Sequence, residues 1–166
     1  MSNLSVCNNL ARTLADEYTL LLKTQNFHWN VEGPMFFSLH TLFEQQYTQL
    51  QNTADRVAER IRALGHRAPG SFDEFKKISK IHDAPIGSLS AIQMIEILVR
   101  DHQILLDDIH QFRKLAESEG DATTATLYDD LAFFHDKAAW MIRSHRGSFS
   151  SISNSPDRTQ IAAAPM

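Results

Sequence analysis

Apolar residues recur at three- and four-residue intervals along four long segments of this chain. That spacing places them on one face of an α-helix, and a helix with one apolar face has to bury it against another element. The expected helices span about residues 4–31, 35–64, 90–119 and 122–146. Residues 90–119 have the most regular spacing, with Ile92, Ile95, Leu105 and Ile109 on one face. The chain is therefore expected to be all-α.

Three interruptions determine how these helices connect. Gly33 and Pro34 separate the first two, since proline disfavours helical geometry in the residue before it. Gly120 ends the third helix, and an N-cap residue for the fourth follows at once. Residues 65–88 are too long for a simple turn, and within them Ser71-Phe-Asp-Glu74 is typical of a capping box before a short helix. This connectivity predicts a ferritin-like four-helix bundle with a short extra helix in the long crossover between helices 2 and 3.

Composition supports a single soluble domain. The predicted bundle occupies residues 1–147, and residues 148–166, rich in Ser, Ala and Pro, are expected to form a flexible tail. Cys7 is the only cysteine, which excludes an intrachain disulfide and favours a reducing compartment. A net charge of −4 argues against a generic binder of polyanions, and no apolar run is long enough for a membrane helix. We therefore expect a cytoplasmic protein.

Two histidines flank the Gly33-Pro34 turn at equal distances. His28 lies six residues before Pro34 and His40 lies six residues after it, so an antiparallel hairpin brings the two imidazoles to the same height. Two histidines at one height could share a metal ion. Glu44, one turn beyond His40, adds a carboxylate on the same helix face. The hairpin is therefore predicted to hold part of a metal site.

A second pair of acids, Asp55 and Glu59, lies too far along the helix to join that site in the same chain. Asp55 follows His40 by 15 residues, which is roughly 22 Å at a helical rise of 1.5 Å per residue. A second copy packed antiparallel about a two-fold axis near Leu50 would bring its acid pair to the histidines of the first copy. Imidazole and carboxylate ligands suit Fe(II), with Mn, Co and Zn as competitors. The spacing thus predicts two identical iron sites shared within a dimer.

Other interpretations of the titratable residues remain open at this point. Asp55 and Glu59 could form a salt-bridged helix face with the arginines that surround them. No Glu-x-x-His pair is present, and the nearest pattern is Asp107 with His110, so an ordinary di-iron site inside the bundle is not expected. Four histidines are expected to be hydrogen-bonded core residues rather than ligands. They are His102, His110, His135 and His145.

The residue strings around these candidates are similar to those of one protein family. HWNVEGPMFFSLHTLFE and DRVAERIRALG closely resemble the Dps family of mini-ferritins, the DNA-binding proteins from starved cells. The resemblance implies a hollow dodecamer of four-helix-bundle subunits, with a mononuclear or di-iron ferroxidase centre at each dimer interface. It also implies that two subunits share the metal ligands. One subunit supplies His28, His40 and Glu44, and its partner supplies Asp55 and Glu59.

The resemblance implies an activity as well. Family members oxidise Fe(II), preferentially with hydrogen peroxide, and store ferric oxyhydroxide in the cavity, which protects DNA from oxidative damage. Trp29 matches the tryptophan beside the iron, which is thought to help quench reactive intermediates; the alternative is an aromatic residue that packs at an interface. Iron enters through acidic three-fold pores. The candidates here, which could instead be a solvated helix N-terminus, are Asp121, Asp129 and Asp130.

DNA is the partner that the sequence supports least. Members that condense DNA commonly carry a Lys-rich terminus, whereas residues 1–11 contain neither Lys nor Arg. Positive charge gathers around the crossover instead, at Arg56, Arg60, Arg62, Arg67, Lys76, Lys77 and Lys80. Two alternatives to an iron-storing ferroxidase follow. One is a nucleoid-associated shell that compacts DNA and has secondary iron chemistry, and the other is a structural helical oligomer whose acids form salt bridges.

Overall fold

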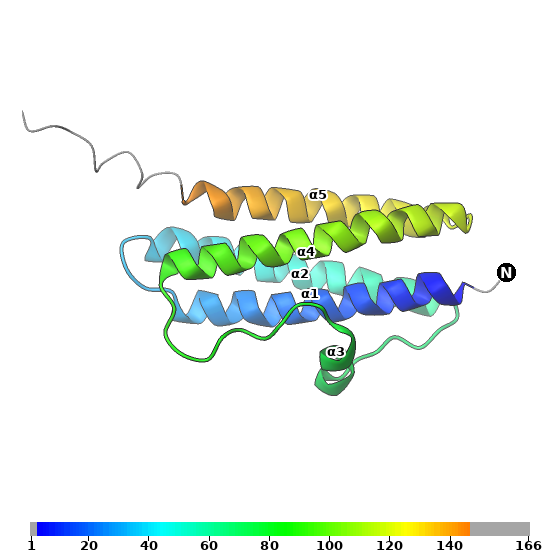
Figure 1. Cartoon of the computed structure of the whole chain (residues 1–166), viewed down its shortest axis with the longest axis horizontal. Coiled ribbons are helices and arrows are strands. Elements are labelled where there is room, and N and C mark those ends of the chain that lie inside the picture. Colours follow the sequence, from blue (N-terminus) through cyan, green and yellow to red (C-terminus); the bar gives the residue numbers. More distant parts are fainter. Residues whose placement is uncertain (1–2, 147–166) are drawn as a thin grey trace, which may run out of the picture.

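The computed structural model describes residues 3–146, which contain five α-helices and no strand. Four long helices run side by side as a bundle (Figure 1): α1 (Leu4–Asn30), α2 (Phe36–Ala63), α4 (Ala91–Ser118) and α5 (Ala122–Ser144). The short α3 (Phe72–Ile78) lies in the crossover and packs against α1. The predicted bundle with an extra crossover helix is confirmed. The tail expected at 148–166 lies outside the described residues.

Side-chain caps start α3, α4 and α5. Ser90 and Gln93 form the complete capping box at the start of α4. The Ser71 hydroxyl accepts a hydrogen bond from the backbone N–H of Glu74 at the start of α3, and the Asp121 carboxylate caps α5 in the same way. Each cap satisfies a backbone donor that the helix itself leaves without a partner. Of the described helices, none is long and apolar enough to cross a bilayer.

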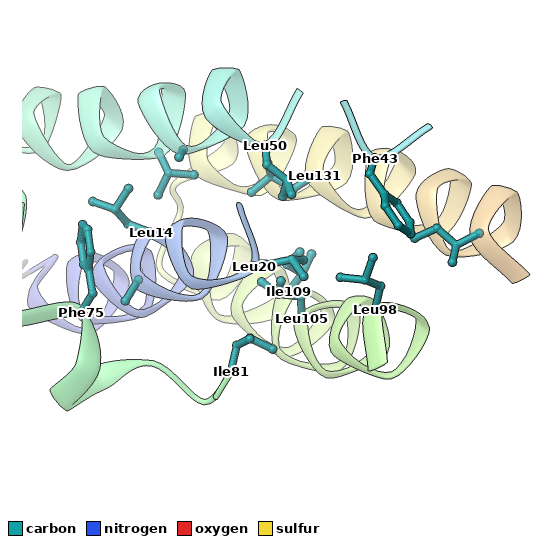
Figure 2. Packing of buried hydrophobic residues seen from close by; sticks show 14 of the residues in the cluster. Leu14, Leu20, Phe43, Leu50, Phe75, Ile81, Leu98, Leu105, Ile109 and Leu131 are labelled. Atoms are coloured by element: carbon teal, nitrogen blue, oxygen red, sulfur yellow. The ribbon is translucent and has the colours of Figure 1, made fainter. Parts of the chain in front are cut away.

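The core lies along the middle of the bundle and receives side chains from every long helix. Figure 2 shows Leu20 of α1, Leu50 of α2, Leu105 of α4 and Leu131 of α5, all of them buried. Burying a leucine side chain stabilises the fold by about 1.5–3 kcal/mol. Three members of the predicted apolar stripe of the first helix are instead exposed on its outer side: Leu4, Tyr18 and Leu22.

One buried carboxylate, that of Asp16, joins the crossover to α1 through hydrogen bonds. Asp16 Oδ1 accepts hydrogen bonds from the Ser79 hydroxyl and from the backbone N–H groups of Lys80 and Ile81. Burial raises the pKa of Asp16 in spite of these bonds. Close by, the Phe75 ring of α3 stacks on Tyr18, with ring centroids 5.0 Å apart. These contacts explain why Tyr18 packs toward α3 and not into the bundle.

Candidate metal centre

The two histidines of the hairpin meet face to face. Gly33 has a φ of +93°, a conformation that residues with a side chain rarely adopt, and it turns the chain between α1 and α2. His28 lies in the last turn of α1, and His40 lies one turn into α2. Their imidazole centroids are 3.8 Å apart and their planes differ by 19°. The expectation that the two rings lie at the same height is confirmed.

Each histidine is fixed by the backbone of the other. Nδ1 of His28 lies 2.8 Å from the carbonyl oxygen of His40, and Nδ1 of His40 lies 2.8 Å from the carbonyl oxygen of His28. Because a carbonyl oxygen only accepts, both Nδ1 atoms carry the proton and donate. In the neutral imidazole the second nitrogen, Nε2, then has a lone pair. A metal ligand needs this arrangement, in which one nitrogen is oriented by a hydrogen bond and the other is available to the metal.

Three carboxylates on α2 are exposed and contact no positive charge in the described part of their own chain. Glu44 lies one turn after His40, whereas Asp55 and Glu59 lie in the second half of the helix. Within residues 3–146, none of the three carboxylates has a hydrogen-bond or salt-bridge partner. Acids on a helix surface usually find a lysine or arginine when one is close. These three are therefore available to an ion or to another protein chain.

The arginines beside these acids point elsewhere. Arg56 donates to Asp130 and Arg60 donates to Asp121, both on or at the start of α5. The interpretation of Asp55 and Glu59 as a salt-bridged helix face is therefore wrong for the described part of the chain. The arginines instead join α2 to α5 and leave the acid pair unneutralised.

The described part of one chain does not bring the five candidate ligands together. Helix α2 continues without a break from Phe36 to Ala63, so Asp55 lies roughly 22 Å along the axis from His40. Among residues 3–146, no group of three or more His, Cys, Asp and Glu side chains lies close enough together to hold a metal ion. The two histidines and the acid pair therefore lie far apart along the hairpin of α1 and α2.

Trp29 lies directly after His28 and is 60% exposed. Phe36 and Phe37, at the start of α2, are also exposed. Large aromatic side chains in contact with water at one end of a hairpin commonly mark a surface that another chain covers. The position of Trp29 is therefore compatible with both interpretations drawn from the sequence, a role beside iron and packing at an interface.

The acids considered as pore residues are all paired. Asp121 binds Arg60, Asp129 binds Arg113, and Asp130 binds Arg56. Thr124 also donates to Asp121, and these bonds together lower the pKa of this acid although its partial burial acts in the opposite direction. Much of the positive charge around the crossover is balanced in the same way, in the pairs Arg67 with Glu74 and Lys80 with Asp108. The described surface thus offers fewer unpaired charges to iron or DNA than its sequence indicated.

A model of the ferritin-like domain matches residues 7–152. DNA protection during starvation protein 2 of Bacillus anthracis is 35% identical over 141 residues, which are 85% of this chain and 96% of that protein. The chain belongs to the Dps family.

Solved structures agree with this membership. Dps from Thermosynechococcus elongatus is similar with a TM-score of 0.85 and 28% identity, over 90% of this chain and 94% of that one. The Dps protein of Vibrio cholerae O1 is similar with a TM-score of 0.82 and 32% identity, over 87% and 90% of the two chains. That protein is described as a member of a broad superfamily of ferritin-like diiron-carboxylate proteins. The fold expected from the sequence is the fold of the Dps family.

The interior of this Dps-family bundle holds a hydrogen-bonded chain that sequence reasoning missed in part. Thr53 donates to Glu17 Oε2 at 2.8 Å, Nε2 of His135 lies 2.9 Å from Glu17 Oε1, and Nδ1 of His135 lies 2.8 Å from Nδ1 of His102. All four side chains are almost completely buried and come from four different helices. Burial and the neighbouring His135 lower the pKa of His102 well below its usual value.

His102 and His135, the two histidines of this hydrogen-bonded chain, were expected in the core, and the structure places them there. Glu17 was not recognised, although it continues the stripe of Leu10 and Leu14 at helical spacing. A carboxylate on an apolar stripe is the signal that could have indicated it. Of the other histidines expected in the core, His110 is exposed, which corrects that expectation, and His145 bonds to a backbone carbonyl of its own helix.

Proposed function

We propose that this chain is the subunit of an iron-storing ferroxidase. It oxidises Fe(II), preferentially with hydrogen peroxide, at sites shared between two copies, and its assembly, a hollow dodecamer built from two-fold dimers, stores the ferric oxyhydroxide. In this role the protein protects DNA by consuming iron and peroxide together. Membership of the Dps family supports the proposal, and the residues of the hairpin give it a chemical basis.

One observation carries the proposal above all others. The bonds from His28 and His40 to each other's backbone place both protons on Nδ1, so that each of the two stacked rings keeps a lone pair on Nε2. Glu44 follows one turn later on α2 and has no partner among the described residues. The hairpin thus orients two imidazoles, one buried and one partly buried, and gives neither Nε2 a partner within the described chain.

The donor set fits iron. Two imidazoles and three carboxylates match the mixed nitrogen and oxygen ligands that Fe(II) prefers, and the carboxylates also suit the harder ferric product. The proposed centre takes His28, His40 and Glu44 from one copy and Asp55 and Glu59 from its partner. Mn, Co and Zn would compete for the same donors.

The reaction needs no cofactor beyond its two substrates. Two Fe(II) ions each lose one electron to hydrogen peroxide, whose O–O bond breaks, and with two water molecules the products are two FeOOH and four protons. The five ligands hold iron where peroxide reaches it, and negative charge on the carboxylates stabilises the higher oxidation state. Trp29, next to His28, is proposed to reduce oxidising species before they leave the site.

A stopped-flow experiment tests the proposal. Apo protein is mixed anaerobically with Fe(II), hydrogen peroxide is added, and the rise of ferric absorbance is followed. We expect fast oxidation at a stoichiometry of two Fe(II) per peroxide, and a slower reaction with dioxygen. Ferric absorbance that rises no faster than in buffer would contradict the proposal.

The matched control is a histidine away from the hairpin. His110 is exposed and lies on α4, so His110→Gln is expected to oxidise iron at the wild-type rate, whereas His40→Gln is expected to be slow. Equal rates for the two variants would show that oxidation occurs at another place on the protein.

A further inference from the structure

Two further aromatic rings lie against the histidine pair. The ring of Phe36, one turn before His40 on α2, has its centroid 4.9 Å from that of His40, at an angle of 30°. The ring of Tyr47 approaches His28 edge-on, with centroids 5.3 Å apart and an angle of 74°. The rings follow one another in the order Phe36, His40, His28, Tyr47, and we refer to these four residues as the ring stack.

The ring stack restrains a motion that the hydrogen bonds alone allow. One bond at Nδ1 fixes a single atom of each imidazole, so the ring can still tilt about that atom and move Nε2. Contacts with a ring on both sides oppose this tilt, and offset or edge-on aromatic contacts are favourable in themselves. Ligands that bind one ion have to be held within about 0.5 Å and 10–20° of the productive geometry, which packing by neighbouring side chains achieves.

We propose that Phe36 and Tyr47 are positioning residues that hold His28 and His40 in the geometry of a metal ligand pair before metal or a second copy arrives. The inference rests on the proposed function, since it concerns the same centre. Neither ring supplies a ligand. Both act through the imidazoles, so that the histidine half-site is complete in a single protomer and only the acid half-site has to be brought by the partner.

The preformed half-site separates two contributions to metal binding. The orientation of the imidazoles is settled on folding, whereas the carboxylates of the partner are added on assembly. Loss of a ring from the stack therefore weakens binding through disorder of the two histidines and leaves the number of ligands unchanged. Because the ring of Tyr47 and not its hydroxyl contacts His28, phenylalanine should replace tyrosine at this position without loss.

Binding of Co(II) to the apo form of the full chain tests the inference without iron oxidation. Visible absorption of bound Co(II) reports both affinity and ligand geometry. We expect Tyr47→Leu and Phe36→Leu to weaken binding about two- to tenfold and to change the shape of the absorption band, because each loses one aromatic contact. Tyr47→Phe should match the wild type. Phe72→Leu is the control, since Phe72 is exposed on α3 and makes no ring contact with a histidine among the described residues.

Two outcomes would overturn the inference. One is wild-type affinity and spectrum in both leucine variants, and the other is an equal loss in Phe72→Leu. If the wild-type protein itself binds no Co(II) and oxidises no Fe(II), the proposed function fails first, so the two failures are distinguishable.

A second measurement does not depend on whether the variants fold. Solid-state NMR of the wild-type apo protein, labelled with ¹⁵N in histidine, should show His28 and His40 each in a single tautomer with the proton on Nδ1. A mixture of tautomers at either residue would contradict a half-site formed before metal binding.

Discussion

The molecule contains two pairs of histidines that use their nitrogens in opposite ways. The first pair, His28 and His40, lies near the turn of the hairpin and is called the surface pair, although His28 itself is buried and His40 partly buried. Each of these histidines donates to the backbone of the other and keeps Nε2 without a partner in the described chain. In the core pair, His102 and His135 bond to each other through their Nδ1 atoms, Nε2 of His135 bonds to Glu17, and Nε2 of His102 is buried without a partner among the described residues. Both pairs join two antiparallel helices, yet only the first can offer two lone pairs to one ion.

On the proposed function, a ligand pair directs both Nδ1 atoms to the backbone and keeps both Nε2 atoms without a partner, whereas the structural pair bonds Nδ1 to Nδ1. Position on an apolar stripe does not distinguish the two pairs. In the core pair, Nε2 of His135 satisfies the buried Glu17 side chain, and leaving that side chain without a partner would cost several kcal/mol. In the surface pair, each histidine bonds to the backbone carbonyl of the other. Changes at the core pair are therefore expected to act on stability, and changes at the surface pair on metal chemistry.

The largest effect is expected from His135→Leu. This change leaves the buried Glu17 side chain with only Thr53 as a partner, and removing one partner of a buried polar group costs about 3 kcal/mol. The free energy of unfolding, measured by urea denaturation at fixed protein concentration, should fall by that amount. The double variant Glu17→Leu/His135→Leu should recover most of the loss, because no carboxyl group is then buried without its histidine partner. A double variant as unstable as the single one would contradict this account.

The next effect is expected at the surface pair. His40→Leu removes one of the proposed imidazole ligands and should lower the initial rate of iron oxidation by about 100-fold. Loss of a residue that only supports a metal ligand already lowers activity by up to about 100-fold. Since His40 is only partly buried, the free energy of unfolding should change by less than about 1 kcal/mol. A large loss of stability without loss of rate would reverse the roles assigned to the two pairs.

The sequence predicted the surface pair better than the core pair for a physical reason. The equal spacing of His28 and His40 from the turn is a local property, so helical geometry was enough to bring their rings together. The bond between Glu17 and His135 joins residues 118 positions apart in the chain, and its existence depends on how α1 and α5 pack. Periodicity shows that a residue faces the core, but it does not show what that residue meets there.

The same distinction applies to the charged residues. Helix boundaries and caps followed from local signals such as Ser90 with Gln93. The pairing of Arg56 with Asp130 crosses from α2 to α5, so the sequence left open whether the arginine would neutralise Asp55 instead. The division of the metal ligands between two copies stays a prediction, because a single chain does not test it.

Acidic pH should lower the stability that the core pair contributes to the fold. The pKa of His102 in the folded protein lies well below its usual value of about 6.5. As the pH falls, the unfolded chain therefore binds a proton at this residue that the folded chain does not bind. Stability from this residue is fully present above about pH 6.5 and decreases as the pH falls, by at most about 1.4 kcal/mol per pH unit. The free energy of unfolding, measured by urea denaturation between pH 7.5 and pH 5, should show this dependence on pH. In His102→Leu the dependence on pH should correspond to about one proton fewer taken up on unfolding, whereas His110→Leu, at an exposed position, should keep the wild-type dependence.

The smallest effect is expected from Thr53→Val. The valine keeps the shape of threonine but loses the hydroxyl that donates to Glu17, and one such hydrogen bond contributes about 1 kcal/mol to stability. Urea denaturation should detect this loss, while the rate of iron oxidation should stay within about twofold of the wild type. A rate as low as that of His40→Leu would mean that the core chain controls the centre.

A mixing experiment tests most directly whether two copies share each site. His40→Leu and Asp55→Asn are prepared separately, both are expected to be slow, and the subunits are then exchanged in equal amounts. In a mixed dimer one site carries both defects and the other carries none, so about a quarter of all sites should be intact after random exchange. The account predicts that the rate of iron oxidation returns to about a quarter of the wild-type rate. No recovery after verified exchange of subunits would contradict it.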